Sequence, residues 1–112
     1  MTTHTPGPWE VLNETEVFTG LGADSGDGVK ALPSDGWMIA DCGDCVTFTE
    51  IGPAELGRDL RKANARLIAA APDLLEALEG VERLCSQSGY IGVNGQYLKV
   101  VRAAIAKARV KP

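Results

Sequence analysis

Cys42 and Cys45 are two residues apart, the spacing of CxxC motifs that carry out thiol redox chemistry or bind zinc. Cys85 and His4, the single histidine, complete the one Cys3His set that the sequence offers. A redox CxxC is favoured at a helix start, whereas this motif has acidic neighbours and lies between strand-like runs. We therefore interpret it as an incidental hairpin turn, and a small metal-binding or redox protein remains the alternative.

Basic side chains and an amide recur on one predicted helix, and two tryptophans lie in the first half of the chain. Guanidinium and ammonium groups pair with phosphate or carboxylate, and indole rings stack on planar ligands. A solvated helix face and core packing are the structural alternatives. Asn64 lowers helix propensity, so it predicts a hydrogen-bonding role, either structural or toward a ligand. The predicted ligand-binding residues are Trp9, Trp37, Arg58, Arg61, Lys62, Asn64 and Arg66.

Catalytic constellations are not evident. A nucleophile activated by histidine would have to use His4, before the first predicted strand, and no two carboxylates stand out as an acid–base pair. The glycine-rich segment over residues 20–28 lacks the lysine and the following helix of a phosphate loop, so it predicts a surface loop. We predict that the chain is not an enzyme and uses no cofactor.

The net charge of −4 is divided unevenly along the chain. Residues 1–57 carry ten acidic side chains and one basic one, whereas residues 58–112 carry five acidic and ten basic ones. Domains that bind nucleic acid commonly have an isoelectric point above about 9, so direct nucleic-acid binding is not expected. Opposite charges predict attraction between the two halves of a chain or between two copies.

The composition changes near residue 52, from a β-rich part (1–52) to a helical part (53–112), within one predicted domain over residues 1–112. Pro72 should kink or stop a helix because proline lacks the amide donor and clashes with the preceding turn. We predict an α+β fold in which a small antiparallel sheet over residues 9–50 packs on two to three helices, 53–71, 72–86 and 96–109. The predicted strands are Trp9–Leu12, Glu16–Thr19, Val29–Leu32, Trp37–Asp41 and Val46–Thr49.

Apolar residues at spacings of three and four give each predicted helix a buried face. The first helix would bury Leu56, Leu60, Ala63, Leu67 and Ala70, the second Leu74, Leu78, Val81 and Cys85, and the third Leu98, Val101, Ile105 and Ala108. A loop or short hairpin over residues 87–96 would join the last two helices. Apolar surface left over on the helices would suit a homodimer.

The N-terminal segment lacks the basic and apolar regions of a secretory signal, and no run of residues is apolar enough to cross a bilayer. Three cysteines without such a signal indicate a reducing compartment rather than a disulfide framework. We expect a cytoplasmic protein with no membrane partner.

Two segments, Thr5–Trp9 (TPGPW) and Ala63–Leu78 (ANARLIAAAPDLLEAL), are more distinctive than the rest. Together they resemble small accessory proteins of tailed phages and prophages, similar to the Ead-like group of lambdoid phages. The resemblance implies action inside the bacterial host and brings no agreed activity or catalytic residue. The cysteine motif lies in the variable middle of that pattern.

Our leading hypothesis is a non-enzymatic binding protein that a phage uses to alter or resist its host. One mechanism is sequestration of a small anionic ligand, such as a nucleotide signal, on the basic helix face beside Trp9 or Trp37. The other is masking of a host protein by the acidic, glycine-rich middle, because an acidic patch repels DNA and attracts proteins that bind DNA. A purely structural or regulatory interaction module is a further alternative.

Overall fold

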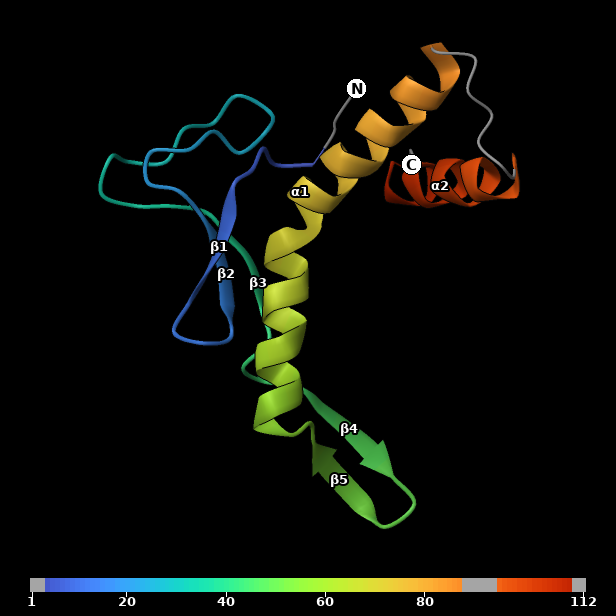
Figure 1. Cartoon of the computed structure of the whole chain (residues 1–112). Coiled ribbons are helices and arrows are strands. Elements are labelled where there is room, and N and C mark those ends of the chain that lie inside the picture. The colour runs from blue at the N-terminus through green and yellow to red at the C-terminus, as the bar shows by residue number, and fades with distance from the viewer. Residues whose placement is uncertain (1–3, 88–94, 110–112) are drawn as a thin grey trace. The chain divides into compact units, whose positions relative to one another are not determined.

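The structure, a computed structural model, describes residues 4–87 and 95–109 and has an α+β fold, as predicted. The chain forms two compact units, residues 1–72 and residues 73–112. The first unit contains all the strands and the beginning of helix α1, and the second contains the rest of α1 and helix α2 (Figure 1). The boundary does not coincide with the change of composition near residue 52. A compact unit need not fold alone, so the single domain stays a prediction.

The first sheet is antiparallel in the order β1-β2-β3. Its strands are β1 (Trp9–Leu12), β2 (Glu16–Thr19) and β3 (Met38–Asp41). Alternation along β2 buries Val17 and Thr19, as expected of a strand with one face toward a core. The prediction of a strand over Val29–Leu32 was wrong. Only a single bridge forms there, because the segment returns to Ala23–Ser25 through isolated backbone hydrogen bonds instead of a ladder.

The glycine-rich segment over residues 20–28 is a loop held by its own side chains. The Asp24 carboxylate accepts hydrogen bonds from the backbone amides of Gly26, at 2.7 Å, and Gly28, at 3.2 Å. These amides are the groups that a phosphate loop would offer to its ligand. The loop therefore directs these two amide donors to its own Asp24 carboxylate.

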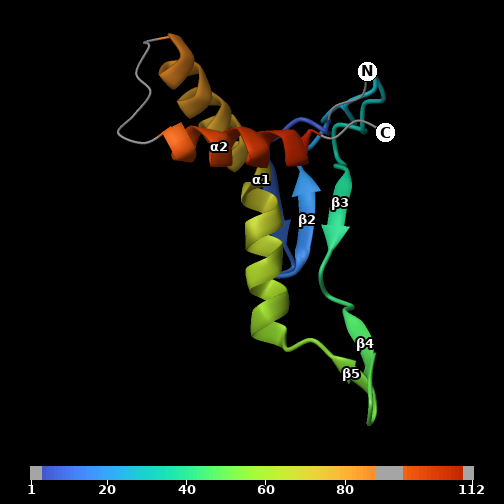
Figure 2. The same ribbon diagram turned by 90° about the vertical axis from the view of Figure 1, so that its right-hand side faces the viewer.

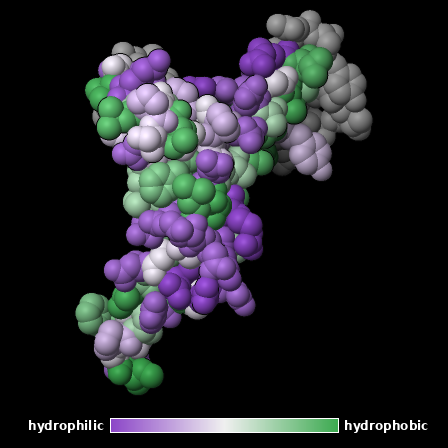
Figure 3. Space-filling view, turned by 90° about the vertical axis from the view of Figure 1, so that its left-hand side faces the viewer, coloured by the Kyte–Doolittle hydropathy of each residue, from purple (hydrophilic) through white to green (hydrophobic). Residues whose placement is uncertain are grey.

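A second, separate sheet consists of β4 (Val46–Thr49) and β5 (Gly52–Glu55). The prediction that the helix starts at residue 53 was wrong, as was the prediction of one sheet. Gly52 has a φ of 120°, which turns the chain so that Pro53 lies opposite Phe48. Proline is tolerated because this ribbon has free edges where no amide donor is needed. The hairpin is solvent-exposed, and Figure 3 shows hydrophobic surface gathered at its end.

Helix α1 (Arg58–Gln87) includes residues 58–71 of the first predicted helix and all of the second, 72–86, with Pro72 inside it. Of the two predicted effects of Pro72, a kink or a stop, the stop does not occur. Proline removes one intrahelical hydrogen bond and strains one turn, and a 30-residue helix retains enough others to continue. Within the first unit, the beginning of α1 lies alongside β1–β3 (Figures 1 and 2).

The face that α1 buries differs from the predicted one. Ala65 is fully buried, whereas Leu60, Ala63 and Leu67 are exposed. The small side chain of Ala65 permits close approach. Charged groups on the same side of α1 bind the β1–β2 turn and the β3–β4 loop, as described below. These polar contacts fix which side of α1 faces the strands, so the more apolar stripe, which includes Leu60 and Leu67, faces solvent.

In the second unit, α2 (Gly95–Ala108) agrees with the predicted last helix, and Leu98, Val101 and Ile105 are half-buried. The α1 prediction was partly wrong here too. Leu75 is buried, whereas three residues assigned to or beside the buried stripe, Leu74, Val81 and Leu84, are exposed. The predicted 87–96 loop lies mostly outside the described residues. No helix in the described part of the chain is long and apolar enough to span a bilayer.

Candidate functional site

The first unit contains a cavity of about 320 Å³ beside the start of α1. One wall consists of the end of β3 and the β3–β4 loop. The other consists of α1 and Leu56, the residue that follows β5. It is lined by Asp41, Cys42, Asp44, Cys45, Leu56, Asn64, Leu67 and Ile68. The structure therefore brings together the cysteine motif and Asn64, which the sequence singled out for different reasons.

Three hydrogen bonds hold the β3–β4 loop in place. The Cys42 amide donates to the Thr15 carbonyl oxygen at 2.8 Å, and the Leu56 amide donates to the Cys45 carbonyl oxygen at 2.8 Å. Between them, Nη1 of Arg61 donates to the Gly43 carbonyl oxygen at 2.6 Å. The loop is thus anchored to the β1–β2 turn, to the end of β5 and to α1, which preorganises this wall of the cavity.

Gly43 is required by space rather than by backbone torsion. A Cβ at this position would lie 2.9 Å from Oγ1 of Thr15 and 3.1 Å from Oδ1 of Asp41. The same Asp41 oxygen accepts a hydrogen bond from the Gly43 amide at 2.9 Å. Glycine therefore lets the loop fold closely around Asp41 while the carboxylate keeps its charge at the cavity.

The cavity combines an apolar floor with an acidic rim. Leu56 and Ile68 are half-buried, while Asp41 and Asp44 are exposed, and no lysine or arginine is among the lining residues. Carboxylates attract cations, and the apolar floor favours an aliphatic chain. The arrangement suits a cationic group on an apolar stem, and it repels a phosphate or carboxylate.

The cysteines are free thiols. Cys42 and Cys45 lie in the connection between two separate sheets, so the predicted hairpin turn is instead a link from one sheet to the other. Cys85 belongs to the second unit. Within residues 4–87 and 95–109, no group of three or more histidine, cysteine, aspartate or glutamate side chains is placed to hold a metal ion.

Three of the predicted anion-binding cations already have acidic or carbonyl partners. Arg58 forms an ion pair with Glu14, and Nζ of Lys62 lies 3.3 Å from the same carboxylate. Hydrogen bonds from Arg58 and then Lys62 hold the pKa of Glu14 below its ordinary value. Arg61, bound to Gly43, also lies 3.5 Å from a Glu55 oxygen. These side chains join secondary-structure elements to one another.

Asn64 and Arg66 are exposed, and neither has a side-chain hydrogen bond or ion pair to any residue in the described part of the chain. Asn64 lines the cavity, whereas Arg66 does not. The predicted basic set is therefore not one open surface.

The two tryptophans have structural surroundings. Nε1 of Trp37 donates to the Ala23 carbonyl oxygen at 3.0 Å, and its backbone amide donates to Oγ1 of Thr19 at 2.8 Å. Trp9 is half-buried and meets His4 edge to face, with ring centroids 5.9 Å apart. Its indole nitrogen is buried without a partner among the described residues. Neither tryptophan lines the cavity.

Sequence reasoning missed Glu14 and underestimated Asp41 and Asp44 as site residues. Glu14 has a φ of 70° in the β1–β2 turn, a conformation uncommon for a glutamate, and no pattern in the sequence signals it. The two aspartates flank the cysteine motif, and that acidic flank was the available signal.

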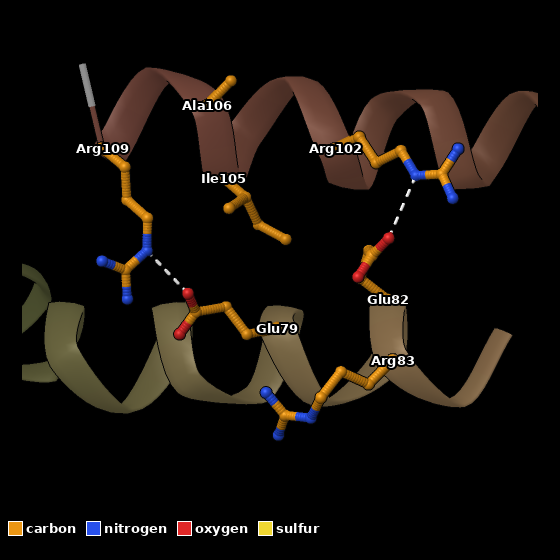
Figure 4. A pocket seen from close by; sticks show the side chains of 7 residues that line it. All are labelled: Glu79, Glu82, Arg83, Arg102, Ile105, Ala106 and Arg109. Carbon is orange, nitrogen blue, oxygen red and sulfur yellow. Dashed lines mark hydrogen bonds and ion pairs between the residues drawn. The ribbon is translucent and has the colours of Figure 1, made fainter. Parts of the chain in front are cut away.

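A second cavity, of about 370 Å³, lies between α1 and α2 in the second unit (Figure 4). Its carboxylates are paired. Glu82 lies 3.2 Å from Nε of Arg102, and Glu79 lies 2.6 Å from Nε of Arg109, which raises the pKa of that guanidinium. Since both its carboxylates pair with arginines across it, this cavity is better explained as a helix–helix contact than as a ligand site.

A family model described as Salmonella phage P22 protein Y8K6 matches residues 1–112, the whole chain. Neither a curated protein nor a solved structure matches the chain.

Proposed function

The chain belongs to the family of Salmonella phage P22 protein Y8K6, and on that premise we propose that it is a non-enzymatic phage accessory protein that binds and masks a basic surface of a host protein. It acts in the cytoplasm of the bacterial host. The partner inserts a lysine or arginine side chain into the cavity lined by Asp41, Asp44 and Asn64. Resistance to a host defence is the role that such masking would serve.

The observation that carries this proposal is the acidic rim over an apolar floor. A lysine or arginine buries its aliphatic stem on apolar surface while its charged head stays near solvent. Leu56 and Ile68 would contact the stem, and Asp41 and Asp44 would meet the head. The side-chain oxygen of Asn64 would accept one further hydrogen bond.

Long-range charge supports the same partner. Residues 1–57 carry ten acidic side chains against one basic one. A surface of one sign accelerates association with a partner of the opposite sign and excludes partners of like sign. Host proteins that bind nucleic acid present such basic surfaces, so the acidic unit would compete with nucleic acid for them.

Sequestration of a small anion has less support. Arg58 and Lys62 share the Glu14 carboxylate, and Arg61 holds Gly43, so an anion would have to displace these partners. The cavity would also oppose it, because the lining charges are negative. The anionic ligand is therefore the competing outcome of the test.

The test measures binding of the full chain to a fluorescent peptide in which lysines alternate with leucines, with the glutamate-for-lysine peptide as the negative control. The double variant Asp41→Asn, Asp44→Asn should weaken lysine-peptide binding by about tenfold, since two charge contacts near solvent are together worth about 1.4 kcal/mol. Asp27→Asn, Asp35→Asn is the matched control, because it removes two exposed aspartates that do not line the cavity.

Equal losses in the two double variants would show a general charge effect and would overturn the cavity assignment. Absence of lysine-peptide binding in the wild-type chain would overturn the proposal itself. A rise in melting temperature with cyclic or linear nucleotides would favour the anionic ligand instead, since a ligand at about 100 times its Kd stabilises a fold by about 2.7 kcal/mol.

A further inference from the structure

Each helix of the second unit exposes an apolar stripe. On α1, Val81 is 47% and Leu84 68% exposed, and on α2, Tyr97 is 74% and Val100 63% exposed. Residues at successive spacings of three, four and three continue both stripes. The α1 stripe is Leu74, Ala77, Val81 and Leu84, and the α2 stripe is Tyr97, Val100, Ala104 and Lys107.

These stripes are distinct from the faces by which the two helices contact each other. Glu79 and Glu82 of α1 point toward α2 and form ion pairs with Arg109 and Arg102 of α2, respectively (Figure 4). A pair of helices can bury one stripe of each against the other. The second stripe on each helix is therefore available to another molecule.

The two stripes match each other in an antiparallel alignment. Leu84 falls opposite Tyr97, Val81 opposite Val100, and Ala77 opposite Ala104. Since both stripes step by three, four and three residues, every position of one stripe meets a position of the other, and three of the four pairs join apolar or aromatic side chains, whereas the fourth places Leu74 opposite Lys107. A parallel alignment would satisfy the spacing equally, so charge has to decide between the two.

Charge favours the antiparallel alignment. It places Asp73, one position before the α1 stripe, next to Lys107, which ends the α2 stripe. Both side chains are exposed, and neither has an ion-pair partner within residues 4–87 and 95–109. The parallel alignment would instead place Lys107 beside Leu84, away from Asp73.

We propose that the second unit binds a second copy of this chain, with the α1 stripe of each copy packed antiparallel on the α2 stripe of its partner. The two-fold operation repeats the contact, so four helices enclose one apolar core and the Asp73–Lys107 pair occurs twice. This dimer does not depend on the proposed host partner, because none of its residues lines the acidic cavity.

Sedimentation equilibrium of the full chain tests the assembly over concentrations that bracket a Kd of about 1 µM. The expected mass is twice that of one chain. Val81→Lys and Val100→Lys should each give the mass of one chain with an unchanged helical circular dichroism spectrum. Phe48→Lys is the matched control, since Phe48 is 83% exposed on the β4–β5 hairpin of the first unit, and it should leave the dimer intact.

A wild-type chain that stays monomeric, or a dimer that only Phe48→Lys dissociates, would overturn the proposal. The orientation is tested by charge exchange at exposed positions where unfolding is not expected. Asp73→Lys and Lys107→Asp should each weaken the dimer by about tenfold through two repeated pairs. The double variant Asp73→Lys, Lys107→Asp should restore it, and failure of that restoration would exclude the antiparallel alignment.

Discussion

Gly7 packs against Pro72 so closely that a Cβ on Gly7 would lie 3.0 Å from the Cβ of Pro72. The contact joins the N-terminal TPGPW segment to the alanine-rich segment of α1, the two stretches on which the resemblance to small phage proteins rests. Residues far apart in the sequence thus meet where α1 leaves the first unit. A side chain at position 7 would separate them.

Gly7→Ala should lower the free energy of unfolding by about 1 to 2 kcal/mol, because the proline ring is rigid and cannot move aside without shifting the helix backbone. Urea unfolding followed by circular dichroism measures the change. Gly20→Ala is the matched control, since a Cβ there meets nothing within 4 Å. A Gly7→Ala chain as stable as wild type would show that the N-terminal segment moves away from Pro72 at no cost.

The contacts of the Glu14 carboxylate predict that the free energy of unfolding decreases at acidic pH. Hydrogen bonds from Arg58 and Lys62 lower its folded pKa below the ordinary 4.5. A lowered folded pKa gives stability that is complete above the unfolded value and is lost as the pH falls through the folded value. Stability should therefore fall below about pH 4.5, and Glu14→Gln should flatten that part of the profile.

Acid titration of the urea midpoint measures this effect. Glu10→Gln provides the control, since Glu10 is exposed and has no side-chain partner among the described residues. If the urea midpoint decreases equally at acidic pH in both variants, the contacts of Glu14 with Arg58 and Lys62 do not persist in solution.

Arg61→Met should destabilise the fold by about 2 kcal/mol, because it removes a charged hydrogen bond to the Gly43 carbonyl while keeping the aliphatic stem. Peptide binding at the acidic cavity should weaken along with it, since the β3–β4 loop loses its anchor on α1. Arg66→Met, an exposed change on the same helix, should stay within about 0.5 kcal/mol of wild type. A smaller loss from Arg61→Met than from Arg66→Met would contradict this role.

The two tryptophans should respond differently to replacement by phenylalanine. Trp37→Phe removes one of two hydrogen bonds to the Ala23 carbonyl, which also accepts from the Ala31 amide, whereas the buried indole nitrogen of Trp9 has no partner among the described residues to lose. The Trp37 variant should therefore be less stable than the Trp9 variant by about 1 kcal/mol. Urea unfolding of both proteins checks the difference, and equal losses would show that packing alone sets the cost.

Local chemistry was enough to predict much of the fold. Trp9–Leu12, Glu16–Thr19 and Val46–Thr49 are short runs of β-branched and aromatic residues between turn residues, and all three form strands with the predicted bounds. Two local patterns misled the prediction. Pro53 resembles the first residue of a helix but lies in a strand, and Pro72 resembles a helix end but lies inside one.

The sequence by itself determined strands β1 to β4, the helices of the second half, the acidic first half and the residue types available for binding, because propensity, turn chemistry and charge act over a few neighbouring positions. Only the tertiary structure decided which face of α1 is buried. Contacts of Glu14 and Gly43 with the charged side of α1 involve residues some 18 to 48 positions away, and they left Leu60 and Leu67 exposed. The same folding brought Asn64 to the cysteine loop, a meeting that no spacing along the chain encodes.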